Sequence, residues 1–174
     1  MTEKRNVNIE REIKFVIDPQ QAESVKDRIE SGTFGIASSD PTINITDTYF
    51  RTNDPMQRIR VREQRSFKET YSQIEVKQIQ RIDGNDKICK ETSVFVRDSS
   101  SAIETMIAIG HEVRNVVRKL RLTYFTDTLQ ISLDYIQGVA EVHVEFEVIS
   151  DQSVPRIDDT FQFVREVMSE YQFS

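Results

Sequence analysis

The sequence predicts an α+β fold in which eight antiparallel β-strands close into a barrel, with helices packed outside and charged side chains inside. Three observations lead to this fold class. Polar and apolar residues alternate along much of the 174-residue chain, as in half-buried strands. Short turn segments separate several successive strands, which is typical of antiparallel hairpins. Three helical segments carry apolar stripes, which need a sheet face to cover.

The predicted strands follow the two-residue period of apolar positions. Turn signals separate several of them, such as TNDP at 52–55 and DGND at 83–86. The eight predicted segments are 7–17, 44–50, 57–65, 71–80, 87–96, 116–125, 128–136 and 141–149.

Three helices are predicted between these strands. The first begins at Asp18-Pro19, a capping residue followed by a proline in the first turn, and ends near Gly32. The second begins near Ser100 and ends at Gly110. The third covers about 158–171, where apolar residues recur at helical spacing.

Six of the eight predicted strands have one ionic face and one mostly apolar face. The first example is NIEREIKF at 8–15, in which Glu10, Glu12 and Lys14 alternate with apolar residues. An ionic face is usually a solvated face. Here the helical stripes need the apolar faces, and closure of eight strands removes exposed edges. Closure with helices outside leaves the ionic faces inside the barrel.

Composition limits the class of protein. With 37% hydrophobic residues in 174, the chain is long enough for one core, so residues 1–174 are expected to form a single domain. The net charge of −6 argues against nucleic acid as a partner. Cys89 is the only cysteine, so neither a disulfide framework nor a thiolate zinc site is expected. No segment has the apolar length of a signal peptide or membrane span, so we expect a cytoplasmic protein with no membrane partner.

The ionic faces indicate a particular ligand chemistry. Arginine and lysine side chains at alternate strand positions suit a polyanion such as a phosphate chain. Carboxylates have no partner in such a substrate, but clustered hard oxygen ligands suit Mg²⁺ or Mn²⁺, which also binds phosphate oxygens. The sequence therefore favours a metal cofactor together with a phosphate chain.

Six motifs in order resemble those of the CYTH superfamily, the triphosphate tunnel metalloenzymes. The first, Glu10-x-Glu12-x-Lys14, resembles the ExExK signature of that superfamily. A short charged pattern arises by chance and is weak evidence by itself, whereas six motifs in the family's order make the resemblance specific. The others are TDTYF at 46–50, RIRVRE at 58–63, EVK at 75–77, RKLRLTY at 118–124 and SLDYIQG at 132–138, followed by the acidic pair Glu145 and Glu147. The resemblance implies an eight-stranded antiparallel tunnel with a charged interior, in agreement with the strand faces.

The resemblance also implies a site and an activity. The activity would be divalent-metal-dependent hydrolysis of a triphosphate: inorganic tripolyphosphate, thiamine triphosphate or a nucleoside triphosphate. Glu10, Glu12 and Lys14 would be catalytic. The substrate would be held by Lys14, Arg58, Arg60, Lys77, Lys90, Lys119 and Arg121. The metal, Mg²⁺ or Mn²⁺, would be held by Glu10, Glu12, Asp134, Glu145 and Glu147.

Two alternatives stay open from the sequence. One is a class IV-type adenylyl cyclase that converts ATP to cyclic AMP and pyrophosphate. The other is a non-catalytic polyphosphate- or nucleotide-binding module, since CKETSV at 89–94 offers Lys90 in place of an arginine and lacks the glutamates that family members commonly have there. An apolar strand face left uncovered by three short helices could also form a homodimer surface.

Overall fold

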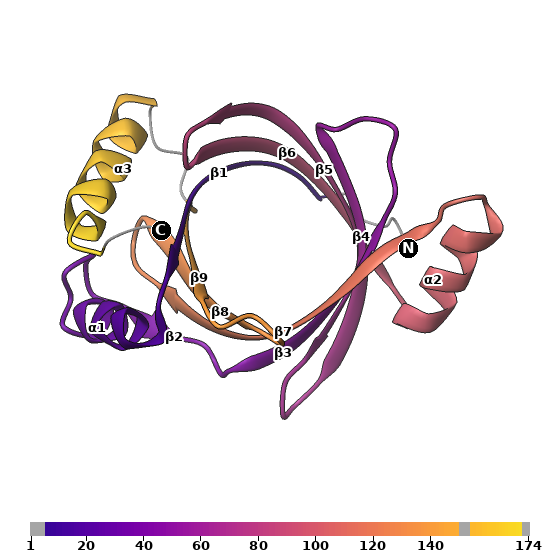
Figure 1. Ribbon diagram of the computed structural model, residues 1–174, viewed down its shortest axis with the longest axis horizontal. Helices are drawn as coiled ribbons and strands as arrows, with labels where there is room; N and C mark the ends of the chain where they lie inside the picture. Colours follow the sequence, from indigo (N-terminus) through magenta and orange to yellow (C-terminus); the bar gives the residue numbers. More distant parts are fainter. Residues whose placement is uncertain (1–5, 150–153, 172–174) are drawn as a thin grey trace. The chain divides into compact units, whose positions relative to one another are not determined.

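A computed structural model describes residues 6–149 and 154–171 of the chain (Figure 1). The elements, in order, are β1 (Asn6–Ile17), α1 (Pro19–Glu30), β2 (Ser38–Ser39), β3 (Ile43–Phe50), β4 (Gln57–Arg65), β5 (Thr70–Asp83), β6 (Asp86–Val96), α2 (Ser99–Ala108), β7 (Val113–Phe125), β8 (Leu129–Ile136), β9 (Val142–Val148) and α3 (Val154–Met168).

The strands form a closed, hydrogen-bonded cycle. Their order in the sheet is β2-β7-β3-β4-β5-β6-β1-β9-β8, and β7 also pairs with β8. Strand β2 lies outside the cycle, so the predicted eight-stranded antiparallel barrel of the α+β class is confirmed, with one additional strand. All eight predicted strands are present. The two-residue β2 was not predicted, because a segment of that length has no measurable alternation.

The chain divides into two compact units, with strands β1 and β7 contributing to both. The first unit contains Met1–Glu10 and Ile43–Leu120, and the second contains Arg11–Thr42 and Arg121–Ser174. The single domain over residues 1–174 stays a prediction. Residues 1–5, 150–153 and 172–174 lie outside the part of the chain that the structure describes.

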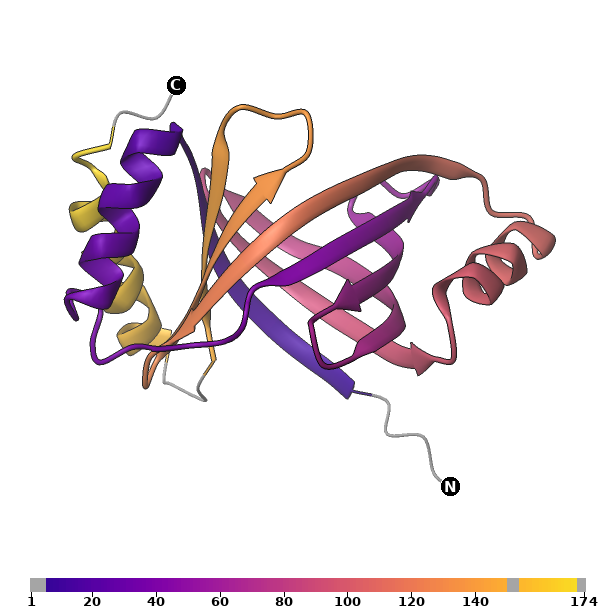
Figure 2. The same cartoon turned by 90° about the horizontal axis from the view of Figure 1, so that it is seen from below.

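In the first unit, α2 covers the apolar face of the β3–β6 strands (Figure 2). Asp98 caps this helix by accepting a hydrogen bond from the Ser101 backbone N–H at 2.7 Å. The buried residues of this core are Phe50, Ile59, Val61, Ala102 and Met106. Hairpin β5–β6 turns at Gly84, whose φ of 58° is a left-handed conformation that favours glycine. The basic residues of β4 and β5 therefore alternate with residues that pack against α2.

In the second unit, helices α1 and α3 lie side by side and cover the apolar faces of β1, β8 and β9 (Figures 1 and 2). Helix α1 begins with the predicted cap at Asp18, which forms a reciprocal capping box with Gln21. Phe146 and Phe161 are among the largest fully buried side chains in this core. The ionic residues of these strands consequently lie on the face turned away from the helices, as the sequence predicts.

Candidate functional site

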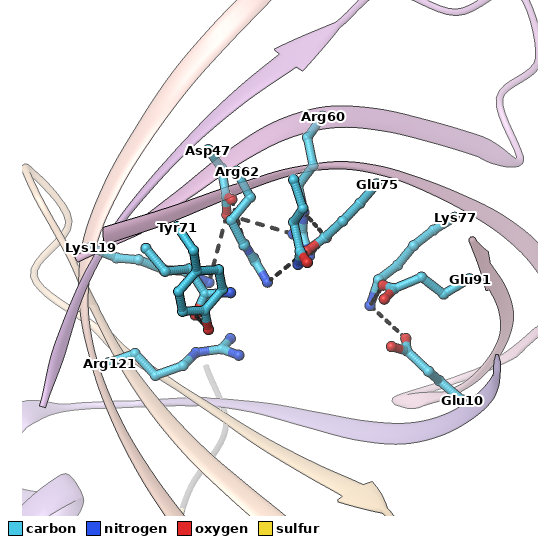
Figure 3. Close-up of polar contacts among 12 residues, drawn as sticks. Glu10, Asp47, Arg60, Arg62, Tyr71, Glu75, Lys77, Glu91, Lys119 and Arg121 are labelled. Atoms are coloured by element: carbon cyan, nitrogen blue, oxygen red, sulfur yellow. Dashed lines mark hydrogen bonds and ion pairs between the residues drawn. The ribbon is translucent and has the colours of Figure 1, made fainter. Parts of the chain in front are cut away.

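In the first unit, two arginines of β4 and two carboxylates of neighbouring strands form a buried network (Figure 3). The Arg62 guanidinium donates from Nε and NH2 to the two carboxylate oxygens of Asp47, at 2.7 and 2.8 Å. Arg60 donates to Glu75, and also to the Tyr49 hydroxyl at 3.1 Å. Cross-strand pairing explains these contacts, because Asp47 lies opposite Arg62 on β3 and Glu75 lies opposite Arg60 on β5.

This network fixes the charge of its members. Burial alone would raise the pKa of Asp47, but the hydrogen bond and charge of Arg62, together with Arg60 and Lys119, lower it to about 2. Burial would likewise raise the pKa of Glu75, yet the charges of Arg62, Arg60 and Lys77 lower it. Burial would lower the pKa of Arg60, but Glu75 and Asp47 raise it. Both carboxylates are therefore ionised at neutral pH, and both guanidinium groups are held in fixed orientations.

Two lysines extend the ionic face of the first unit. Lys77 on β5 donates to a Glu10 oxygen at 2.5 Å and lies 3.1 Å from a Glu91 oxygen (Figure 3). Lys119 on β7 lies 3.9 Å from an Asp47 oxygen, and its side chain is only 8% exposed. An ammonium group carries three N–H donors and a positive charge, which is the donor chemistry that a phosphate oxygen requires.

In the second unit, the ionic face is richer in carboxylates. Lys14 lies 3.3 Å from an oxygen of Glu12 and 3.3 Å from an oxygen of Glu145. Arg121 donates to the two Asp134 oxygens at 2.6 and 2.7 Å, and its NH2 group is 3.5 Å from Glu145. The four carboxylates of this face are Glu12, Asp134, Glu145 and Glu147. The cations Lys14 and Arg121 lie beside them on the same face.

This carboxylate-rich face has the donor chemistry of a magnesium or manganese site. Glu12 lies opposite Glu147, and Glu145 lies opposite Ser132, in the pairing of β1, β9 and β8. The Ser132 hydroxyl is buried, with no hydrogen-bond partner among the described residues. Carboxylate and hydroxyl oxygens are ligands that hard divalent cations prefer. Within 6–149 and 154–171, no three His, Cys, Asp or Glu side chains are already grouped as a metal site.

Two predicted substrate-binding residues lie away from these contacts. Arg58 is exposed near the start of β4, where it donates to the backbone carbonyls of Pro55 and Gln57 at 2.6 and 2.8 Å. Lys90 is exposed and precedes Glu91 on β6. Because successive strand residues point to opposite faces, Lys90 lies on the face opposite to the one where Glu91 meets Lys77.

Several residues of the ionic face were not among the predicted site residues. Asp47 and Glu91 are present in quoted motifs, but nothing local in the sequence shows that they contact Arg62 and Lys77. Arg62 and Glu75 have the inward parity in the sequence, and the structure shows them paired within the network. The signal that identifies all four is strand alternation combined with cross-strand register.

The chain belongs to the CYTH domain family, whose model matches residues 8–172. None of the curated proteins is similar enough to count as a match. The described residues contain no helix of the length and apolarity that a membrane span requires.

Solved structures share the fold. A conserved hypothetical protein from Pyrococcus furiosus is 21% identical, with a TM-score of 0.74 over 92% of this chain and 90% of its own. A Pyrococcus horikoshii protein is 23% identical, with a TM-score of 0.71 over 91% and 88%. A Hippeastrum protein proposed as an adenylyl cyclase, and described as having a dominant triphosphatase activity, is 12% identical, with a TM-score of 0.64 over 95% and 90%. At these identities, the likeness concerns the fold alone.

Proposed function

We propose that this protein is a divalent-metal-dependent triphosphatase. The observation that carries the proposal is the set of buried and half-buried cations on one strand face, ordered by fixed carboxylates. Nitrogen atoms of Arg60 and Lys119 lie 3.5 and 3.9 Å from an Asp47 oxygen. Lys77 forms ion pairs with Glu10 and Glu91. Membership of the CYTH family supports the same reading.

The basic residues would bind the phosphate chain. The proposed set on the ionic face is Lys14, Arg60, Lys77, Lys119 and Arg121. Arg58 and Lys90, which the sequence also suggested, lie away from these contacts. Asp47 and Glu75 act through the arginines, because their hydrogen bonds fix the guanidinium groups before a ligand arrives. Preorganised charge of this kind lowers the barrier to phosphoryl transfer, since little has to reorient as charge develops.

The carboxylates would hold the metal. Glu10, Glu12, Asp134, Glu145 and Glu147 are the proposed ligands of Mg²⁺ or Mn²⁺. The gathering of Glu12, Asp134, Glu145 and Glu147 on the paired strands β1, β8 and β9 supports this assignment, because hard divalent cations prefer carboxylate oxygens. When bound, such a cation supplies positive charge that neutralises phosphate oxygens.

The catalytic residues would be Glu10, Glu12 and Lys14. A carboxylate of the first pair would accept a hydrogen bond from the attacking water and orient it toward the terminal phosphorus. Lys14, which lies between Glu12 and Glu145, would donate to a phosphate oxygen as negative charge accumulates there. Each of these steps uses a group that the strand β1 alternation presents on one face.

A class IV-type adenylyl cyclase is the second candidate. It would use the same phosphate-binding residues, with the ribose hydroxyl of ATP in place of water. The Hippeastrum protein, which shares the fold, is described both as a proposed cyclase and as having a dominant triphosphatase activity. A binding module without turnover is the third candidate.

A cytoplasmic location and a homodimer stay predictions from the sequence.

Product analysis tests these candidates directly. The purified chain is incubated with Mg²⁺ or Mn²⁺ and, separately, tripolyphosphate, thiamine triphosphate and ATP, with phosphate, pyrophosphate and cyclic AMP measured together. We expect phosphate release, reduced at least about 100-fold in the Glu10→Ala/Glu12→Ala double variant. Glu104→Ala, an exposed carboxylate of α2, is the matched control and keeps full activity. Formation of cyclic AMP with pyrophosphate would support the cyclase instead. Binding of a triphosphate without any product would support the binding module.

A further inference from the structure

A cavity of about 400 Å³ opens on the first unit, beside the ionic face. It is lined by Gln64, Glu69, Tyr71, Gln73 and Phe95, from β4, β5, β6 and the β4–β5 turn. Its volume lies in the range of small-molecule sites, which is roughly 300 to 1,000 Å³. None of these residues has a role in the proposed binding of phosphates or metal.

Two aromatic rings give this cavity an apolar wall. Phe95 is 64% exposed and Tyr71 is 38% exposed, and their rings meet edge to face with centroids 6.0 Å apart. The Tyr71 hydroxyl donates to the Gln64 side-chain oxygen at 2.8 Å, which restrains the ring. Exposed aromatic rings held in place favour a planar apolar partner, because stacking removes their faces from water.

The remaining lining is polar and suits the edge of a heteroaromatic ring. Gln64 and Gln73 offer amide groups, and Glu69 offers a carboxylate. The β4–β5 turn is ordered by Ser66, whose backbone N–H donates to the Glu69 carbonyl at 2.9 Å and whose hydroxyl accepts from the Glu69 N–H at 3.1 Å. Glu69 is therefore on a defined turn rather than a loose loop.

One residue of the cavity lining, Gln73, is hydrogen-bonded to the cationic network. Gln73 lies opposite Arg62 on one side and Phe95 on the other in the strand register. Its side-chain amide donates to Glu75, the carboxylate that also contacts Arg60 and Arg62. Successive residues on one strand face are roughly 7 Å apart, so Tyr71, which lies opposite Gln64, is one position beyond Arg62 and Gln73 on this face.

We propose that this cavity binds the planar heteroaromatic ring of an organic triphosphate whose phosphates bind the adjacent cations. The inference rests on the proposed function and narrows its substrate class, because inorganic tripolyphosphate has no group to fill the cavity. The ring stacks on Phe95 and Tyr71, and its polar edge faces Gln73 and Glu69.

Binding measurements on full-length variants test this assignment. ATP, thiamine triphosphate and inorganic tripolyphosphate are titrated into the wild-type chain, Phe95→Ala and Tyr71→Ala by calorimetry. We expect Phe95→Ala to weaken at least one ring-bearing ligand about tenfold, as for loss of a stacking ring, and to leave tripolyphosphate within about twofold. Phe67→Ala is the matched control, because Phe67 is 80% exposed on the β4–β5 turn and does not line the cavity.

The outcomes separate the two proposals. If tripolyphosphate binds, but Phe95→Ala and Tyr71→Ala leave both ring-bearing ligands unchanged, the ring site is rejected and the triphosphatase proposal stands. If all three ligands weaken equally in Phe95→Ala, the ring has no specific role and the ring site is again rejected. If the wild-type chain binds none of the three, both proposals fail.

Discussion

Replacing Asp47 with asparagine removes the charge that orients the arginine pair. The side chain keeps its size but loses the carboxylate that receives two hydrogen bonds from Arg62. Arg62 then stays buried beside an amide that matches its donors poorly. Breaking one partner of a buried ion pair is strongly destabilising because it leaves the other charge uncompensated.

The size of the effect follows from the pKa of Asp47. A shift from 3.8 to about 2 corresponds to about 2 kcal/mol of stability at neutral pH, since each unit is worth about 1.4 kcal/mol. Because the folded pKa is the lower one, this stability is present above pH 4 and is lost as the pH falls toward 2. About half of it is gone by pH 3. The pH-dependent part of the cost of Asp47→Asn is therefore about 2 kcal/mol at pH 7 and about 1 kcal/mol at pH 3.

Urea unfolding of both proteins at pH 7 and pH 3 measures this cost. The control is Asp83→Asn, which removes one partner of the exposed Arg81–Asp83 pair, whose oxygen and nitrogen are 2.8 Å apart. That exposed pair should contribute below about 1 kcal/mol at either pH. An Asp47→Asn protein as stable as the wild type at pH 7, or one whose deficit is the same at both pH values, would refute the reasoning.

Three further predictions concern stability. Burial and the hydrogen bond to Glu30 raise the pKa of Tyr124 to about 12, so the wild type should lose stability as the pH rises from 10 toward 12, and alkaline unfolding of Tyr124→Phe should lack this loss. Asp18→Ala removes the cap of α1 and should lower the free energy of unfolding by about 1 kcal/mol, measured in urea, while Asp18→Asn should restore most of it. Phe146→Ala opens a cavity between the sheet and the helices of the second unit and should cost about 3 to 5 kcal/mol by the same assay; a cost below 1 kcal/mol would contradict its placement in that core.

The strands could be predicted from the sequence because ionic and apolar residues alternate along them. The apolar residues of this alternation form the two hydrophobic cores of the structure. It could not predict which charges meet, since that depends on register between strands far apart in the chain. Glu10 meets Lys77 across 67 positions. Alternation also does not show which contacts a side chain makes at the end of a strand. Arg58 has the same strand parity as Arg60, but its side chain donates to the backbone carbonyls of Pro55 and Gln57. Helix α3 begins at Val154, before the predicted start at 158, because its apolar stripe does not define the first turn.

Lys90 illustrates how a motif can misdirect a residue assignment. The comparison of CKETSV with a family pattern favoured Lys90 as a substitute for arginine, whereas alternation along β6 places Glu91 on the ionic face. The aromatic cavity was not anticipated either. Tyr71 and Phe95 are far apart in sequence, and only the pairing of β5 with β6 brings their rings together.

The central claim is that the ionic strand face binds a triphosphate, and calorimetric titration of tripolyphosphate tests it most directly. The informative variant is Lys119→Met, which removes a cation near Asp47 without adding a cavity, and Lys68→Met on the exposed β4–β5 turn is its control. The account predicts binding by the wild type and the control, weakened about tenfold or more in Lys119→Met. Equal affinity in all three proteins, or no binding by the wild type, would contradict it.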